Sequence, residues 1–195
     1  AMKSLAKDCF VDGDKELVDK WISYVKNGGN LILTCRTAQK DRYGRLPEAP
    51  FGSMITPLTG NEMNFYDLLL PEDPGTVVMN GKEYAWNTWG EILNPPADAQ
   101  IWATYKNEFY EGSPAVTFRK LGKGTITYVG VDSHNGALEK DILKKLYVQL
   151  NIPVMDLPYG VTMEYRNGVG IVLNYSDQPY TFNLSKGAKA LIGTT

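Results

Sequence analysis

Hydrophobic residues between positions 17 and 25 recur with the spacing of one helix face, and Asp12 or Asp14 can cap this helix. Gly28 and Gly29 then end it, because glycine accepts the left-handed conformation common after helices. Residues 30–35 follow as an apolar run typical of a strand covered on both faces. This order predicts an α/β fold. The apolar helix positions are Leu17, Val18, Trp21, Ile22 and Val25.

The middle of the chain has the composition of strands. Residues 101–105, 115–118 and 125–131 are rich in β-branched and aromatic side chains, which predicts three strands. Gly112-Ser113-Pro114 and Gly122-Lys123-Gly124 separate them, and both tripeptides favour turns. These residues therefore predict one unit of a sheet.

A hairpin is predicted before these strands, and a helix after them. Residues 76–79 and 82–86 flank Asn80-Gly81, a pair that favours a type I′ turn. Residues 137–150 predict a helix, so the unit ends in a crossover from strand to helix. The apolar face of that helix consists of Leu138, Ile142, Leu146 and Leu150.

Residues 36–72 lack a regular pattern, because four prolines interrupt every candidate element. We expect at most short helical turns at residues 63–69. A long irregular segment is uncommon in a compact domain unless it borders a site or contacts a partner. Large side chains in this segment are therefore candidates for a subunit interface, above all Tyr43, Phe51, Phe65 and Tyr66, with Leu46 and Met54 beside them.

After residue 157 the pattern changes to short strands only. About 40 residues rarely fold alone without disulfides or a partner surface. We therefore expect a first domain of residues 1–155 and a small antiparallel β domain of residues 156–195, which packs through Val161, Met163, Ile171 and Leu173. The predicted strands are residues 161–166, 169–175, 180–184 and 190–192.

Charge and composition exclude several classes of function. The net charge of −2 and the pI near 5.5 argue against nucleic acid as a partner, and the largest cationic cluster is Arg119-Lys120 with Lys123. No apolar run is long enough to span a membrane, and the N-terminus does not resemble a signal peptide, which favours the cytoplasm. Cys9 and Cys35 are too few for a structural zinc site. We expect no cofactor and no metal.

The candidate catalytic residues have simpler structural interpretations. A glycosidase needs two carboxylates in one cleft, but Glu139 and Asp141 lie among lysines on a predicted helix, and Glu108 and Glu111 belong to no motif. Cys35 lacks the glycine-rich elbow of a nucleophile, and no motif links it to the only histidine, His134. We therefore predict a buried thiol and no catalytic residue.

Aromatic side chains are frequent between positions 86 and 110. Such rings stack on sugars and also anchor protein interfaces. Because strands alternate their side chains between two faces, we expect most of these rings in the core and most of the rest in a subunit interface. They are Trp86, Trp89, Trp102, Tyr105, Phe109 and Tyr110.

Several motifs in order resemble the downstream half of glycoside hydrolase family 42 β-galactosidases. They are Tyr-Val-Lys-Asn-Gly-Gly-Asn-Leu-Ile-Leu-Thr at residues 24–34, Tyr-Glu-Gly-Ser-Pro-Ala-Val-Thr at 110–117, Leu-Gly-Lys-Gly at 121–124, Tyr-Val-Gly at 128–130, and Leu-Pro-Tyr-Gly-Val at 157–161 before Arg166. The resemblance implies a trimerisation domain with a Rossmann-like or flavodoxin-like sheet, similar to class I glutamine amidotransferases, followed by a small β domain.

The chain departs from this family in two respects. It lacks the catalytic barrel, so no catalytic glutamate carries over, and a galactoside would bind to that absent barrel. Residues 2–11 are also short and polar compared with the family's first strand and helix. The resemblance thus implies a non-catalytic assembly region of a homotrimeric β-galactosidase. The alternatives are a carbohydrate-binding module that uses exposed aromatic residues and, more weakly, an enzyme of the amidotransferase type.

Overall fold

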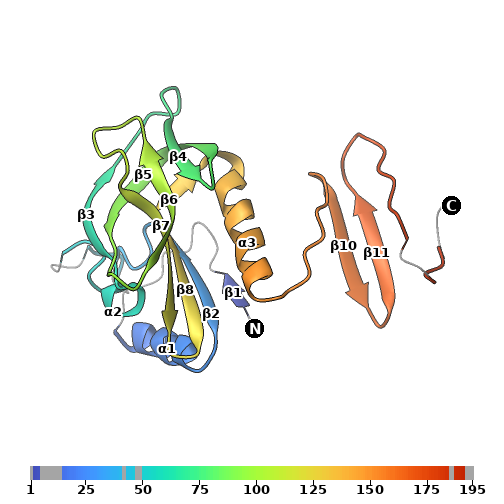
Figure 1. Cartoon of the computed structure of the whole chain (residues 1–195), viewed down its shortest axis with the longest axis horizontal. Helices are drawn as coiled ribbons and strands as arrows, with labels where there is room; N and C mark the ends of the chain where they lie inside the picture. The colour runs from blue at the N-terminus through green and yellow to red at the C-terminus, as the bar shows by residue number, and fades with distance from the viewer. Residues whose placement is uncertain (1, 5–14, 41–42, 47–49, 185–186, 192–195) are drawn as a thin grey trace. The chain divides into compact units, whose positions relative to one another are not determined.

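The computed structural model describes residues 2–4, 15–40, 43–46, 50–184 and 187–191 (Figure 1). The chain divides into two compact units, Ala1–Lys145 and Leu146–Thr195. The first unit is a mixed sheet with helices, and the second contains a two-stranded antiparallel sheet. The predicted division after residue 155 stays a prediction.

Helix α1 (Lys15–Lys26) and strand β2 (Asn30–Thr34) form as the sequence predicts. Gly28 has a φ of 105°, and the amides of Gly28 and Gly29 donate to the carbonyls of Val25 and Tyr24, which satisfies the end of the helix. Strand β2 lies parallel to β1 (Met2–Ser4) on one side and to β8 (Gly124–Val129) on the other. Strands β1, β2 and β8 therefore form the parallel part of the sheet.

The described sheet has nine strands and is mostly antiparallel. Its order is β1-β2-β8-β7-β6-β4-β5-β3, with β9 paired to β5. The described pairings beyond β1–β2–β8 are all antiparallel. The further strands are β3 (Glu62–Asp67), β4 (Gly75–Met79), β5 (Lys82–Asn94), β6 (Gln100–Lys106), β7 (Pro114–Leu121) and β9 (Val131–Ser133).

Gly130 allows the antiparallel part of the sheet to close on itself. It separates β8 from β9, donates to the carbonyl of Ala115 in β7 at 2.8 Å and accepts from the amide of Glu91 in β5 at 2.7 Å. A Cβ at this position would lie 3.1 Å and 3.2 Å from the carbonyl oxygens of Ala115 and Glu91, so a glycine suits the close approach. The pairings β9–β5–β4–β6–β7–β8 thus form a circuit that Gly130 closes by joining β8 to β9 along the chain.

The hydrophobic core lies between α1, the short helix α2 (Thr56–Thr59) and strands β2 and β8. Burial of these side chains supplies most of the driving force that holds helix and sheet together. The fully buried members of this core are Val25, Leu33, Ile55 and Leu58.

The predicted hairpin is confirmed, and its second strand is longer than expected. Asn80 and Gly81 have φ values of 51° and 78°, as a type I′ turn requires. The three predicted strands between residues 101 and 131 are also confirmed as β6, β7 and β8. The prediction of helical turns at residues 63–69 is wrong, because residues 62–67 form β3. This strand exposes side chains on both faces and so lacks an apolar alternation, while the ladder to β5 stabilises it.

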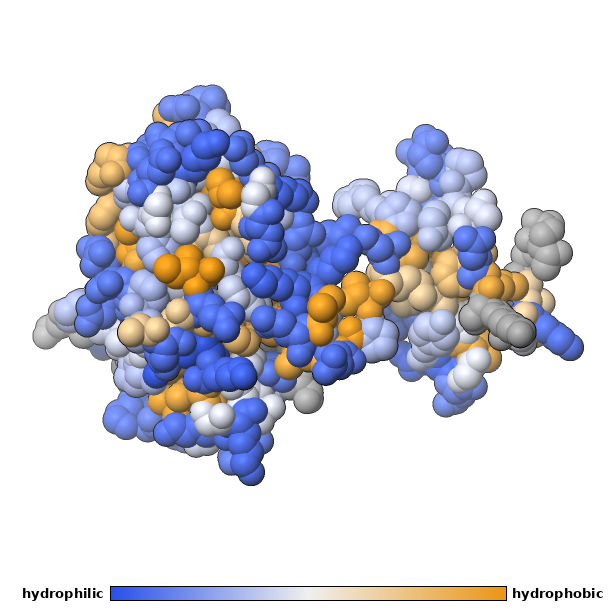
Figure 2. All heavy atoms as spheres, viewed as in Figure 1, coloured by the Kyte–Doolittle hydropathy of each residue, from blue (hydrophilic) through white to orange (hydrophobic). Residues whose placement is uncertain are grey.

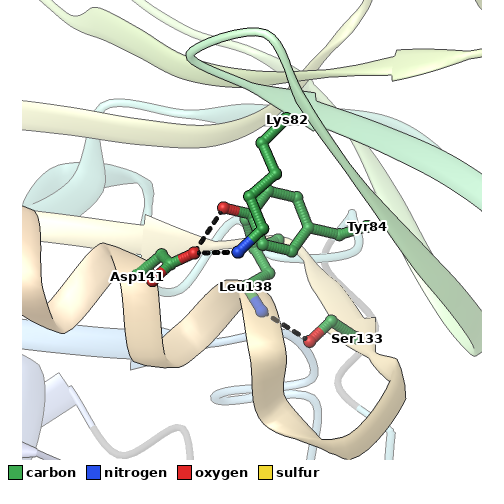
Figure 3. Close-up of polar contacts among 5 residues, drawn as sticks. All are labelled: Lys82, Tyr84, Ser133, Leu138 and Asp141. Atoms are coloured by element: carbon green, nitrogen blue, oxygen red, sulfur yellow. Dashed lines mark hydrogen bonds and ion pairs between the residues drawn. The ribbon is translucent and has the colours of Figure 1, made fainter.

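Polar side chains fix the start of helix α3 (Ala137–Gln149), which follows a single turn, η1 (His134–Gly136). The hydroxyl of Ser133 accepts a 3.2 Å bond from the amide of Leu138 (Figure 3). The carboxylate of Glu139 accepts from the amide and hydroxyl of Ser133. This reciprocal pattern is similar to a capping box, but Glu139 follows Ser133 by six residues and not by three.

A second polar contact ties α3 to the hairpin of β4 and β5. The carboxylate of Asp141 accepts a 2.7 Å bond from the hydroxyl of Tyr84 and forms a 2.6 Å ion pair with Lys82, as Figure 3 shows. Two residues from one strand therefore converge on one oxygen of the helix, which fixes where α3 lies relative to that hairpin.

The second unit contains β10 (Val161–Arg166) and β11 (Val169–Asn174), joined by a type I′ turn at Asn167 and Gly168. The strand predicted at residues 180–184 is absent, and residues 190 and 191 are not in a strand, while residue 192 lies outside the described residues. The side chain of Asn174 bonds the carbonyl of Gln178 at 2.8 Å, so the chain turns after β11. The predicted packing partner of this unit stays a prediction.

Candidate subunit interface

Strand β3 is an edge of the described sheet, since its pairing partner there is β5 alone. The register shifts between Met63 and Phe65, so Asn64 is an additional residue opposite β5. The outer side of an edge strand presents backbone amides and carbonyls that can pair with another chain. Strand β3 therefore provides a surface on which a partner can dock.

Aromatic side chains flank β3 on both of its faces. Phe65 stacks on Phe109 with ring centroids 5.6 Å apart and an interplanar angle of 8°, and Tyr110 meets Phe65 edge-on at 5.8 Å. Tyr66 stacks on Trp89 at 4.3 Å and 11°. Neighbouring residues of one strand thus belong to two different aromatic clusters, because strand side chains alternate between faces.

The structure places three of the four predicted interface residues in or beside β3, Phe51 with Tyr66 in one aromatic cluster and Phe65 in the other. Phe51 lies 5.5 Å from Tyr66 and 6.0 Å from Trp89. Tyr43 instead packs against Arg45, whose guanidinium carbon lies 5.0 Å from the centroid of the Tyr43 ring. Tyr43 is 73% exposed. Whether a partner covers these rings stays a prediction.

Further exposed apolar side chains follow β3 in the sequence or, like Phe109, stack on it. Leu68, Leu70 and Phe109 are 59%, 64% and 86% exposed, beside Phe65 and Tyr66 at 37% and 47%. Figure 2 shows apolar side chains, in orange and tan, among hydrophilic ones on the face in view. We call Phe65, Tyr66, Leu68, Leu70 and Phe109 the edge-strand surface. Leu68 and Leu70 are not among the interface residues predicted from the sequence. The signal for them is the apolar run Leu68-Leu69-Leu70 before Pro71.

Most of the other aromatic residues belong to the core, as the sequence analysis expects. Trp86, Trp102, Tyr105 and Tyr110 are at most 5% exposed, whereas Phe109 projects from the surface. The hydroxyl of Tyr110 donates to Asp67 at 2.7 Å, and burial together with this bond raises the pKa of Tyr110 above its usual value. This bond ties the loop after β6 to the end of β3.

Beneath the edge-strand surface lies a buried carboxylate, Glu91, that no motif in the sequence singles out. Glu91 has no exposed surface, and its oxygens accept bonds from the hydroxyl of Tyr128 at 2.6 Å, the amide of Arg36 at 2.7 Å and the indole of Trp89 at 3.0 Å. Burial raises the pKa of Glu91 to about 7, although these donors act in the opposite direction. Its donors come from three separate segments of the chain.

Glu91 fixes the position of Trp89, and Trp89 supports the outer rings. The indole is only 7% exposed, with Tyr66 stacked on it and the guanidinium of Arg36 5.0 Å from its centroid. Arg36 has a φ of 65°, so the backbone is left-handed at the residue after β2 whose amide donates to Glu91. The buried carboxylate therefore acts on the surface through Trp89.

The structure gives no support to Cys35 as a nucleophile. Its thiol is free, and burial raises its pKa far above the usual value, with the carboxylate of Glu91 acting in the same direction. A reactive thiol needs a lowered pKa, so this environment is that of an inert thiol. Cys35 is half-buried, whereas the sequence analysis predicts a buried thiol. Cys9 lies outside the described residues.

Three of the four carboxylates considered as catalytic residues have structural contacts. Glu139 caps α3, Asp141 binds Lys82 and Tyr84, and Glu111 accepts a 3.1 Å bond from the amide of Asn107. Within the described ranges, no group of three or more histidine, cysteine, aspartate or glutamate residues is arranged to hold a metal ion. The described helices are too short or too polar to cross a membrane.

Comparison with known proteins gives a consistent result. A family model described as the β-galactosidase trimerisation domain matches residues 12–158. β-Galactosidase LacA of Lactobacillus acidophilus is 35% identical over 117 residues, and β-galactosidase BgaH of Haloferax lucentense is 28% identical over 192 residues. These alignments cover 60% and 97% of this chain but only 17% and 28% of those proteins. The chain thus spans a minor part of its relatives.

Solved structures share the fold. The β-galactosidase of the Antarctic haloarchaeon Halorubrum lacusprofundi is similar with a TM-score of 0.79 and 26% identity, over 90% of this chain and 26% of that chain. The β-galactosidase of the psychrophilic Marinomonas ef1 is similar with a TM-score of 0.77 and 22% identity, over 99% of this chain and 27% of that chain. At 22% identity, the similarity to the Marinomonas enzyme shows the fold alone.

Proposed function

Because the chain belongs to the family of β-galactosidase trimerisation domains, we propose that it holds three copies of a larger β-galactosidase together. In this proposal the chain is the non-catalytic assembly region, and the part of the protein that acts on β-galactosides lies outside it. The large share of each relative that the chain leaves uncovered supports this division of roles.

The edge-strand surface is the observation that carries the proposal. It combines an edge strand with exposed aromatic and leucine side chains, and interfaces are enriched in such aromatic residues. A monomer that exposes such a patch risks aggregation unless a partner covers it. The predicted interface residues Phe51, Phe65 and Tyr66 belong to this surface or its support, and Tyr43 would be a separate contact.

The finer assignment of the fold is also a proposal. The parallel strands β1, β2 and β8 with α1 would correspond to part of an open sheet like that of class I glutamine amidotransferases. The order of helix α1, glycine turn and buried β2 supports this assignment. The antiparallel strands would then be an addition that carries the interface.

Sedimentation velocity of the 195-residue chain over a wide concentration range tests the proposal. We expect association toward a trimer as concentration rises, and a twofold dimer or a strict monomer would contradict it. A chromogenic β-galactoside provides the second measurement, for which we expect no turnover above a matched blank. Turnover that survives repurification would show that the chain is itself catalytic.

A further inference from the structure

The two segments that carry the edge-strand surface are acidic, and the guanidinium of Arg36 lies over Trp89 on the Tyr66 side of it. Residues 62–73 and 107–113 contain six carboxylates and no lysine, arginine or histidine. Lys106, the nearest cation in the sequence, forms a 2.5 Å ion pair with Glu83 on the neighbouring hairpin. An apolar centre carried by acidic segments fits a partner whose contact surface is cationic. The six carboxylates belong to Glu62, Asp67, Glu72, Asp73, Glu108 and Glu111.

The opposite charge gathers at the turn between β7 and β8. This hairpin, residues 114–129, contains three cations and no carboxylate. Lys120 and Lys123 are exposed, and the amide of Lys123 donates to the carbonyl of Lys26 at 3.1 Å, which places the end of α1 beside the turn. Arg119 is engaged by Asp98 at 3.0 Å. We call Lys26, Lys120 and Lys123 the cationic end.

The acidic loop of residues 107–113 and the cationic end lie at opposite ends of β7, whereas Glu62 follows Asn61, whose side chain donates to Thr117 within β7. The acidic loop of residues 107–113 comes directly before β7, and the turn of the cationic end comes directly after it. An eight-residue strand separates them by about 23 Å, at roughly 3.3 Å per residue. Opposite charges held this far apart in one copy remain available to neighbouring copies.

Charge also discriminates between the possible symmetries. A twofold contact centred on the edge-strand surface would place this surface against itself, and its carboxylates would repel each other. A ring of three requires a contact between two different surfaces, in which each copy uses both of them once. Surfaces of opposite sign on one chain meet that requirement.

We propose that the edge-strand surface of one copy binds the cationic end of the next copy, an inference that rests on the proposed assembly function. The aromatic and leucine side chains supply the apolar centre of the contact, with Lys120 and Lys123 facing its carboxylates. Because the attraction is between partly exposed charges, salt weakens it.

Charge reversal tests this pairing in the 195-residue chain. One variant carries Glu72→Lys and Glu108→Lys, a second carries Lys120→Glu and Lys123→Glu, and a third carries all four. We expect each double reversal to weaken self-association about tenfold, since like charges then face each other. The fourfold variant should associate more tightly than either double reversal, because the two surfaces are again opposite in sign.

A matched control reverses exposed charges outside both surfaces, Glu164→Lys and Lys189→Glu, and should leave association unchanged. Circular dichroism and thermal melting establish that all variants fold. Two results would overturn the pairing and leave the assembly function standing. The first is self-association that neither double reversal changes. The second is a fourfold variant whose association is weakened about a hundredfold, as two independent effects would give. A wild-type chain that stays monomeric at every concentration overturns both.

Discussion

Tyr128 donates a 2.6 Å hydrogen bond to the carboxylate of Glu91, and these residues, from β8 and β5, are 1% and 0% exposed. The same carboxylate binds the amide of Arg36 and the indole of Trp89. A buried carboxylate costs folding free energy unless such donors compensate for lost water. Glu91 therefore links three segments of the first unit and fixes Trp89 beneath the edge-strand surface.

Glu91 should make stability depend on pH between about 4.5 and 7. Its pKa is raised from 4.5 to about 7 by burial, so the folded state holds a proton that the unfolded state has lost. This contribution to stability is fully present below the unfolded pKa and is lost as pH rises through the folded pKa, a change of about 3 kcal/mol. Urea unfolding across this range measures the free energy of unfolding.

The control for that prediction is Glu91→Gln, which keeps the shape of the side chain and cannot titrate. Its free energy of unfolding should fall less between pH 4.5 and 7 than that of the wild type. Equal slopes in the two proteins would assign the pH dependence to other groups.

Tyr128→Phe should destabilise the fold and displace the pH dependence. It leaves one oxygen of Glu91 without its donor in a fully buried site, which costs about 1–3 kcal/mol. The bond from Tyr128 lowers the pKa of Glu91, so its removal should extend the pH-dependent range upward. The same urea titrations report both effects, and an unchanged upper limit would contradict the assigned role of Tyr128.

Phe109→Ser should weaken self-association and leave the fold intact. Its side chain is 86% exposed, so folding buries little of it, while an interface would bury most of it. Loss of an aromatic anchor typically weakens binding about tenfold or more. The control is Tyr159→Ser, a 98% exposed aromatic outside the edge-strand surface. If both variants sediment as the wild type does, Phe109 lies outside the interface.

The contacts of Asp141 should contribute unequally to stability. Tyr84 is 5% exposed and donates to Asp141, so Tyr84→Phe should lower the free energy of unfolding by about 1 kcal/mol. The side chain of Lys82 is 64% exposed, so Lys82→Met should cost less than about 1 kcal/mol. Chemical denaturation of both variants and of Asp141→Asn provides the comparison. A larger loss for Lys82→Met would reverse the ranking.

Local patterns in the sequence determined the elements that depend on local physics. The stripe from Leu17 to Val25 is sufficient for α1, because a helix bonds within itself and only its face needs a partner. Asn80-Gly81 specifies its hairpin, because few residue pairs accept positive φ at both positions. The motifs at residues 24–34, 110–117 and 157–161 likewise indicate the family without any knowledge of the tertiary structure.

Only the tertiary structure decided β3, the closure of the sheet and the role of Glu91. Strand β3 carries no apolar alternation and exists because the distant β5 pairs with it. Glu91 looks like any glutamate of an amphipathic strand, and its donors come from residues 36, 89 and 128. Strand pairing and burial depend on residues far apart in the chain, so a single-sequence pattern does not contain them.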